Sequence, residues 1–460
     1  MTDRLARALD RASAARLIPG NAVRHLPDSA AALDAMLVLI AGARHAVHFE
    51  NYIIRGDRTG HRFAAALAER ARAGVRVRVL YDALGSIATR RRFWNELRQA
   101  GAEVRSFRPL LASGPFEVLS RDHRKLVVVD GREAMLGGLC IGDEWAGDPA
   151  RGRLPWRDTM VSVCGPAVAA LEGSFARVWA SVGAPLPPDA LAPTAESCGS
   201  SALRVIDGLP GQSRAYRAVQ LLAAAAQERL WITDAYLVAP PPLYASLVDA
   251  AKNGVDVRLL LPGTSDIPVV RSLTRVGYRD LLRAGARIFE YGGPMIHAKT
   301  LVVDREWARV GSTNLNISSL LGNHELDIIG ECDSLTEALA AQFRHDTAHS
   351  REIVLFERRR LPARLVPAPA APAPPEPLQH KRSRRELQAA AAIALVQVAG
   401  GARRALAGGA AGTLALLGGL LIVFPTAMTV VLATGALATS LLLAVYALAR
   451  RRRRRRTDAA

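Results

Sequence analysis

Two stretches of the sequence share one spacing of histidine, lysine and aspartate. HRKLVVVD runs from His123 to Asp130 and HAKTLVVD from His297 to Asp304, and both read His, any residue, Lys, any four residues, Asp. Only four lysines stand against fifty-six arginines in the chain, yet two of the four occupy this same position. Chance seldom repeats such a pattern, so these positions require a compact ammonium and not a guanidinium fork.

The two stretches read as strands whose first residues carry the chemistry. Residues two apart point to the same face of a strand, so His123 with Lys125, and His297 with Lys299, can converge on one ligand. The two motif aspartates lie seven residues after the histidines, so their side chains point to the opposite face of the strand, at its end. This position favours a structural role. One such motif alone would more often be a surface accident, whereas two copies related by a pseudo-twofold axis can share a single cleft.

Each motif is followed, after a gap of six residues, by a segment of small residues. The second copy reads GSTN, 311–314, in which Ser312 and Asn314 offer hydrogen-bond donors. The first copy reads GGLC, 137–140, with Gly138 and Cys140 at the matching positions. A thiol replaces an amide poorly as a donor, so the first copy is expected to bind phosphate less well.

Paired histidines with paired lysines fit exchange at a phosphodiester. Imidazole titrates near neutrality, so one neutral and one protonated ring can coexist. A covalent intermediate would divide the exchange into two easier steps. Lys125, Lys299 and Asn314 can stabilise charge on the non-bridging oxygens. We expect no cofactor and no metal, because the sequence shows no carboxylate cluster that would hold an ion.

The elements around the motifs repeat in order. Short runs rich in valine and isoleucine alternate with longer helical stretches, which predicts an α/β fold. Matching blocks recur at offsets near 180 residues: 48–54 with 232–238, 70–82 with 249–262, and 93–107 with 278–291. The sequence therefore predicts a duplicated domain made of two mixed sheets with flanking helices, related by a pseudo-twofold axis.

These motifs resemble the phospholipase D superfamily, and the likeness covers most of residues 20–350. Within it, FENYIIRGDRTG, GGLCIGDEW, PWRD and SDIPVVRSLTRVGYRDLLRAGARIFEY look most like bacterial cardiolipin synthases. The resemblance implies a phospholipase D-like fold in each half. It also implies that His123 attacks phosphorus to form a phosphohistidine, while His297 acts first as general acid and then as general base.

The resemblance further supplies acidic groups to orient the histidines. Asp158 in PWRD lies thirty-five residues after His123, and Glu325 in NHE lies twenty-eight residues after His297. A carboxylate on the second ring nitrogen fixes the tautomer and orientation of an imidazole. The alternative is that both are ordinary surface carboxylates.

The C-terminal part of the chain has a different composition. From Glu376 onward thirteen basic residues stand against three acidic ones, which gives +10 of the formal net charge of +18. No charged residue occurs between Arg404 and Arg450, and Pro425 interrupts this run. A length more than twice that of one span predicts a transmembrane hairpin, 405–424 and 427–449, with both ends cytoplasmic.

The predicted organisation follows from these patterns. Its parts are an N-terminal extension (1–20), two phospholipase D-like repeats (21–195 and 196–360), a Pro/Ala-rich linker with a basic juxtamembrane segment (361–404), two transmembrane helices (405–449) and an Arg-rich tail (450–460). The charged N-terminus lacks a secretory signal, so the body is expected in the cytoplasm at the inner (cell) membrane. The four cysteines are expected to be free thiols in a reducing compartment.

The expected reaction is phosphatidyl transfer, in which two phosphatidylglycerol molecules give cardiolipin and glycerol. An anionic membrane is the expected partner, because the basic tail lies beside an apolar stretch. Three alternatives remain: phospholipid hydrolysis, a membrane-tethered nuclease, and a non-catalytic binding or scaffolding protein. A nucleic-acid partner is not expected, since the body without its tail is only mildly basic.

Overall fold

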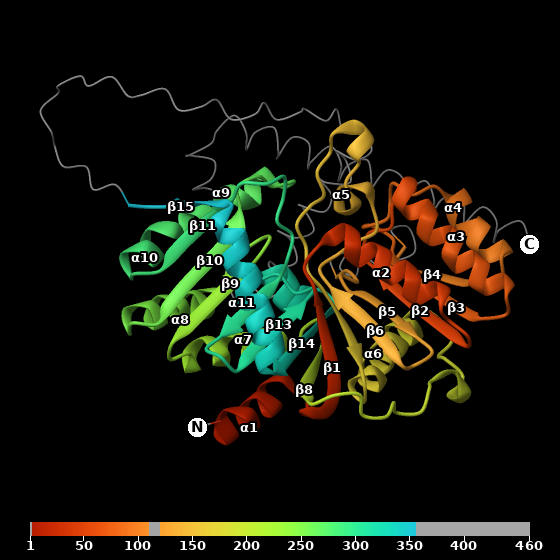
Figure 1. The fold of residues 1–460 in the computed structure, drawn as a ribbon, viewed down its shortest axis with the longest axis horizontal. Coiled ribbons are helices and arrows are strands. Elements are labelled where there is room, and N and C mark those ends of the chain that lie inside the picture. The colour runs from red at the N-terminus through yellow and green to blue at the C-terminus, as the bar shows by residue number, and fades with distance from the viewer. Residues whose placement is uncertain (1, 110–119, 356–460) are drawn as a thin grey trace, which may run out of the picture. The chain divides into compact units, whose positions relative to one another are not determined.

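The computed structural model describes residues 2–109 and 120–355, in which helices cover both faces of a mixed sheet (Figure 1). The described strands of the N-terminal half are β1 (Ile18–Leu26), β2 (Ala46–Asn51), β3 (Arg76–Asp82), β4 (Glu103–Phe107), β5 (Lys125–Val129), β6 (Glu133–Gly137) and β7 (Met160–Cys164). Those of the C-terminal half are β8 (Ser201–Gly208), β9 (Arg229–Thr233), β10 (Asp256–Pro262), β11 (Arg287–Tyr291), β12 (Thr300–Val303), β13 (Trp307–Gly311), β14 (Glu325–Glu331) and β15 (Ser350–Ile353).

Helices precede and follow these strands. In the first half they are α1 (Thr2–Ser13), α2 (Ser29–Ala41), α3 (Arg58–Arg72), α4 (Arg91–Gln99), α5 (Asp143–Ala146) and α6 (Ala167–Ser181). In the second half they are α7 (Arg214–Ala225), α8 (Pro241–Lys252), α9 (Pro268–Val276), α10 (Tyr278–Arg283) and α11 (Asp333–Ala348).

The strands of the two halves pair in the same order. The first half runs β1-β7-β6-β5-β2-β3-β4 and the second runs β8-β14-β13-β12-β9-β10-β11, with β15 added at the edge. In each half one set of three strands is parallel (β2, β3, β4 and β9, β10, β11), and the others pair antiparallel. The expectation of a mixed α/β fold is confirmed.

The expectation of two separate sheets is wrong. Strands β1 and β8 pair antiparallel, with Ile18 opposite Leu203 and Asn21 opposite Ser201, so both halves form one 15-stranded sheet. This pairing satisfies the backbone groups of two strands that would otherwise be exposed edges. The predicted boundary between residues 20 and 21 falls inside β1.

The motif strands form because their side chains are apolar on both faces. In β5 the side chains of Leu126 and Val128 join a core under α6 and α11, while Val127 and Val129 join the core under α2, α3 and α4. Residues of β12 alternate in the same way between the α11 side and the α7 and α8 side. Burial on both faces is typical of the central strands of a layered α/β fold, and it holds the residues at the strand mouths rigidly.

The motif aspartates lie at the far ends of these strands. Asp130 accepts hydrogen bonds from the backbone N–H groups of Arg44 (2.9 Å), His45 (2.7 Å) and Ala46 (2.8 Å). Asp304 does the same for residues 227–229. Both adopt a left-handed backbone conformation, with φ of 53° and 49°, which aspartate tolerates better than most residues. Each carboxylate therefore closes a turn at the sheet edge opposite the histidines.

Replacing Asp130 by alanine is expected to lower the free energy of unfolding by about 2–3 kcal/mol at pH 7, because three N–H groups lose a charged acceptor. Burial alone would raise the pKa of Asp130, but hydrogen bonds from Ala46, Arg44 and His45 outweigh burial and lower that pKa. A depressed pKa contributes stability above the unfolded value of about 3.9, and this contribution is lost as the pH falls through the folded value. Urea unfolding at pH 7 and pH 3 should show the difference between wild type and variant shrinking at low pH; an equal difference would contradict the account.

The expectation of four free cysteines is wrong. Cys164 at the end of β7 forms a disulfide with Cys198, while Cys140 and Cys332 are buried free thiols. The backbone N–H of Cys198 donates to the carbonyl of Gly20 (3.0 Å), which places the segment before β8 beside β1 and hence near the end of β7. Nothing in the spacing of the four cysteines could predict this pairing.

Thiol titration tests the disulfide directly. In denaturant without reductant, two thiols per chain are expected to react with a thiol reagent, and four after reduction. Peptide mapping should assign the unreactive pair to Cys164 and Cys198. Four reactive thiols before reduction in protein purified under air would contradict the pairing.

Within residues 2–109 and 120–355, no helix is long and apolar enough to cross a membrane. The predicted linker, the hairpin at 405–449 and the Arg-rich tail lie outside the described residues.

Candidate active site

Both motif histidines lie at the same ends of the central strands, where β5 and β12 begin and where the two halves meet. This side of the sheet is called the histidine edge below. His123 lies two residues before β5 and His297 three residues before β12. The N–H of His123 donates to the carbonyl of His324 (2.9 Å), and the N–H of His297 donates to that of Arg157 (2.7 Å). The backbone of each histidine is thus held by a segment from the opposite half.

The acidic orienters also cross between the halves. Nδ1 of His123 lies 3.0 Å from Oε2 of Glu325, and Nδ1 of His297 lies 2.7 Å from Oδ2 of Asp158. All four side chains are buried, so the two acids are not surface carboxylates. In sequence, Asp158 follows His123 and Glu325 follows His297. In the structure each acid binds the histidine of the opposite half. Neither half is therefore complete without its counterpart.

The motif lysines are buried beside the histidines. Nζ of Lys125 donates to the carbonyl of His123, and Nζ of Lys299 donates to the carbonyl of His297. Lys125 also lies over the ring of Tyr52, at 5.0 Å from its centroid. Burial lowers the pKa of Lys299 to about 8, which leaves its ammonium mostly charged at neutral pH. Two buried cations beside two imidazoles make a strongly anion-binding site.

The pKa values of both motif histidines are lowered. Burial, and then the charge of Lys299, lower the pKa of His297 to about 4. Burial, and then the charges of Lys125 and Lys299, lower the pKa of His123 well below its ordinary value. That one ring is neutral and the other protonated at working pH stays a prediction. A bound phosphodiester anion would offset the lysine charges and raise both pKa values.

The two carboxylates differ in charge state. Burial alone would raise the pKa of Asp158, but His297, Lys299 and the N–H of Thr159 outweigh burial and lower it. Burial raises the pKa of Glu325 to about 7. An ionised carboxylate favours a proton on its histidine, so His297 beside Asp158 is the better general acid and His123 the better neutral nucleophile.

The GSTN segment supports this site in two ways. Oγ of Ser312 donates to Oε2 of Glu325 (2.5 Å), so this hydroxyl holds the carboxylate. Asn314 is buried, its Nδ2 lies 3.4 Å from Oγ of Ser319, and its Oδ1 has no hydrogen-bond partner among the described residues. A buried amide with unused capacity suits a ligand. Cys140, at the matching position of the first half, is buried in the apolar core of that half.

Gly138 lies directly against Asp158. A Cβ at this position would overlap Oδ1 of Asp158, which already accepts from the N–H of Thr159 (2.8 Å). Only glycine leaves room for this carboxylate. Gly138 therefore positions Asp158 by leaving room for its carboxylate.

Replacing Gly138 by alanine is expected to displace Asp158 and to lower kcat by about 100-fold or more, because small misplacements of catalytic groups have effects of this size. Thermal unfolding and initial rates of lipid turnover check this. Gly42, whose φ is −76° and whose added Cβ would make only ordinary contacts at 3.6 Å, provides the matched control as Gly42→Ala. Equal activity of Gly138→Ala and wild type would contradict the positioning role.

Aromatic rings around His297 were not predicted. The rings of Trp145, Trp156 and Tyr236 lie 5.6, 6.0 and 5.9 Å from the His297 ring. Nε1 of Trp145 also donates to Oδ2 of Asp158 (3.1 Å), the same oxygen that accepts from His297. The stretches GDEW and PWRD contain both tryptophans, but nothing in the sequence places them against a histidine 140 residues away.

A buried ionic network joins the halves behind the first motif. Arg124, next to His123, forms an ion pair with Asp207 of β8, which also pairs with Arg177 (2.6 Å). Arg124 further donates to Oγ of Ser174 (2.8 Å). Removing one partner of a buried pair leaves an uncompensated charge, so this network fixes how the first motif meets the second half.

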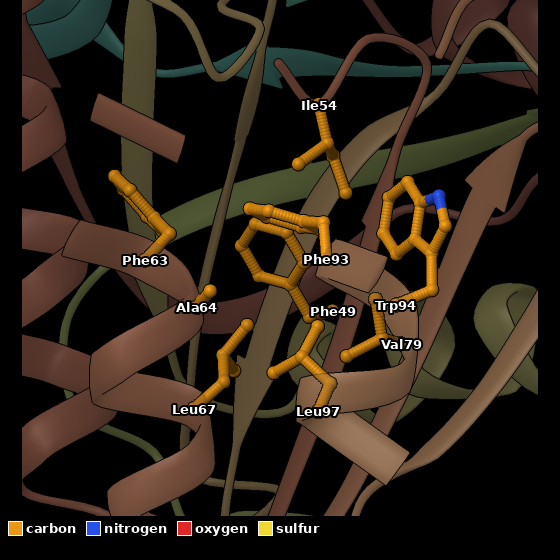
Figure 2. A pocket seen from close by; sticks show the side chains of 9 residues that line it. All are labelled: Phe49, Ile54, Phe63, Ala64, Leu67, Val79, Phe93, Trp94 and Leu97. Carbon is orange, nitrogen blue, oxygen red and sulfur yellow. The ribbon is translucent and has the colours of Figure 1, made fainter. Parts of the chain in front are cut away.

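The small cavity in Figure 2 lies elsewhere. Nine apolar side chains line it, among them Phe49, Phe63 and Trp94, all within the core of the first half. None of the motif residues lines it. Its apolar walls carry no group that could bind a phosphodiester.

Comparison with known proteins agrees with the motifs. The family model described as "Cardiolipin synthase, PLD-like domain" matches residues 36–143 and 219–347, one segment in each half. Cardiolipin synthase A of Pseudomonas aeruginosa is 36% identical over 357 residues, which cover 77% of this chain and 72% of that protein. Cardiolipin synthase A of Pseudomonas fluorescens is 36% identical over 346 residues, 74% and 70% of the two chains.

The chain belongs to the phospholipase D-like cardiolipin synthase family. The predicted resemblance is confirmed, and so is the class of enzyme, a phosphatidyltransferase of the phospholipase D superfamily. The crystal structure of phosphatidylserine synthase from Haemophilus influenzae superimposes with a TM-score of 0.60 at 14% identity, covering 76% of this chain and 92% of that one. This likeness shows a shared fold.

Proposed function

We propose that this family member transfers a phosphatidyl group from one phosphatidylglycerol to a hydroxyl of a second, giving cardiolipin and glycerol. The observation that carries the proposal is the buried pair of histidines, each held by a carboxylate of the opposite half and flanked by two buried lysines. The similarity to proteins named cardiolipin synthase A supports the choice of lipid.

In the first step Nε2 of His123 attacks phosphorus and the bond to the glycerol oxygen breaks. His297 donates a proton to that oxygen, so glycerol leaves neutral and a phosphatidyl-histidine remains. Lys125, Lys299 and Asn314 hold the non-bridging oxygens as negative charge grows on them. The site's low dielectric makes these interactions stronger than they would be in water.

In the second step a hydroxyl of another phosphatidylglycerol gives its proton to His297 and attacks phosphorus. The phosphorus–nitrogen bond breaks, cardiolipin forms, and His123 returns to its neutral state. Asp158 stabilises the imidazolium form of His297, which is present before the first step and again after the second. Glu325 and Ser312 keep Nε2 of His123 directed at phosphorus.

We further propose that the two halves arose by duplication, which their common strand order and the double match of the family model support. Residues 405–449 would form a transmembrane hairpin and residues 450–456 a cytoplasmic arginine cluster, on the strength of their composition. The enzyme would then work at the cytoplasmic face of the cell membrane.

Product analysis tests this function. Purified full-length protein is incubated with phosphatidylglycerol in detergent, and lipids and glycerol are measured by mass spectrometry beside a His123→Ala variant. Cardiolipin with an equal amount of glycerol is expected from the wild type alone. Phosphatidic acid without cardiolipin would mean hydrolysis, and unchanged lipid would overturn the lipid assignment.

A further inference from the structure

Helix α9 carries apolar side chains on a face that no described residue covers. Val269, Leu273 and Val276 are 53%, 48% and 79% exposed. Their spacing of four and three residues places them on one side of the helix. Large aliphatic side chains grouped on one exposed face indicate a surface that meets an apolar partner.

The opposite face of α9 lies over the active site. Val270 of the helix and Ile267 before it are buried in a cluster with Tyr236, against which Trp156 packs. The rings of Tyr236 and Trp156 are those that surround His297. A single layer of side chains therefore separates the exposed stripe of α9 from the histidine that protonates the leaving group.

Other loops at the histidine edge also expose aliphatic residues. Strands β3, β6, β10 and β13 end where β5 and β12 begin, as their registers show. The segments that follow three of these strands expose Ile87 (45%), Leu154 (70%) and Ile317 (38%). Figure 1 shows α9 and α5, helices that follow β10 and β6, along the histidine edge.

Arginines accompany these apolar groups. Arg271 in α9, Arg279 shortly after it, and Arg90 and Arg91 shortly after Ile87 form no ion pair with any residue in the described part of the chain. Arg275 is paired with Glu290. Aliphatic side chains interleaved with uncompensated arginines suit the interface of an anionic bilayer, where the aliphatic groups enter the acyl boundary and the arginines meet phosphates.

We propose that the histidine edge is a membrane-docking face, in which α9 with Ile87, Leu154 and Ile317 lies in the interface of an anionic lipid bilayer. The inference rests on the proposed function, since it presumes a lipid substrate, and it adds where that lipid enters. A phosphatidylglycerol headgroup would pass from the bilayer between α9 and the loops of the other half to the histidines. The predicted hairpin tethers the chain, whereas this face would orient the body.

A site-specific fluorophore distinguishes the docking face from general attachment by the tail. Val276→Cys and Val38→Cys, each in the full-length chain, are labelled with an environment-sensitive dye. Val38 is a matched control: it is 73% exposed, and it lies in the last turn but one of α2, which leads toward the opposite sheet edge at Asp130. The native thiols Cys140 and Cys332 are buried, so labelling is selective.

Phosphatidylglycerol vesicles are expected to shift the emission of the Val276 dye to the blue and to make it quenchable by nitroxide lipids, with no change at Val38. An equal response at both positions, no response at Val276, or an equal response with phosphatidylcholine vesicles would overturn the docking face. A change at Val276 that depends on protein concentration without lipid would instead assign the stripe to a second copy of the chain, and would overturn it too.

A kinetic experiment separates this inference from the proposed function. Leu273→Asp is expected to lower turnover of phosphatidylglycerol in vesicles by about tenfold or more and to leave turnover of a short-chain, monomeric phosphatidylglycerol unchanged. Val38→Asp is the control and should change neither rate. Equal loss on both substrates would overturn the docking role, whereas a wild type inactive on both would overturn the proposed function itself.

Discussion

Replacing His123 by glutamine is expected to lower the rate of phosphatidylglycerol turnover by about 10⁴-fold or more. Glutamine is close in size and can still hydrogen-bond to Glu325, but it cannot form a covalent bond to phosphorus. The remaining donors would bind the headgroup without dividing the exchange into two steps. Initial rates of glycerol release from phosphatidylglycerol in detergent measure the effect.

An exposed histidine in the same half serves as the control for His123→Gln. His45 is exposed, and its role in the structure is a backbone hydrogen bond to Asp130. His45→Gln should therefore retain wild-type turnover. A His123→Gln variant that is folded and keeps more than about a tenth of the rate would show that His123 is not the nucleophile.

Replacing Asp158 by asparagine is expected to lower kcat by about 10³- to 10⁴-fold, with little change in KM. The lowered pKa of Asp158 means that this carboxylate is charged at neutral pH, and its charge allows His297 to carry the proton that it gives up in the first step and regains in the second. An amide keeps the shape of the site and loses that charge. Steady-state kinetics on phosphatidylglycerol would show the loss in kcat.

Glu325→Gln is the matched comparison for Asp158→Asn. Since burial raises the pKa of Glu325 to about 7, this group is about half protonated at pH 7, and its neutral isostere should cost at least tenfold less than Asp158→Asn at that pH. The difference between the losses of kcat in the two variants should widen as the pH falls, because more of Glu325 is then neutral in the wild type. A larger loss in Glu325→Gln than in Asp158→Asn would reverse the roles of the two histidines.

The motif chemistry could be predicted because it is local. His123 with Lys125 and His297 with Lys299 are two residues apart where the chain enters β5 and β12, and the apolar residues that follow fix each strand. Repetition of the motif implied a shared cleft, and the structure places both histidines at one edge. The structural role of the aspartates at the strand ends could likewise be predicted, because an odd spacing from the histidines places them on the opposite face of the strand.

Features that depend on how the halves meet could not be predicted. Asp158 lies nearer to His123 in sequence but binds His297, because the contact is set by the pairing of β1 with β8 and by backbone bonds across the interface. The same holds for Trp145 and for the Cys164–Cys198 disulfide. The lowered histidine pKa values arise first from burial, which a motif alone does not show, and then from the lysine of the same motif, with a smaller contribution from the lysine of the other half.

A trapped intermediate tests the central claim most directly. Wild-type protein is mixed with phosphatidylglycerol that carries radioactive phosphorus, quenched in alkali after milliseconds to seconds, digested and mapped by radioactivity and mass spectrometry; the phosphorus–nitrogen bond of phosphohistidine survives these conditions. The account predicts radioactive phosphorus on the peptide that contains His123, formed together with one glycerol and lost when unlabelled phosphatidylglycerol is added. Label on the peptide that contains His297 instead, or glycerol release with no covalent species in any variant that slows the second step, would contradict it.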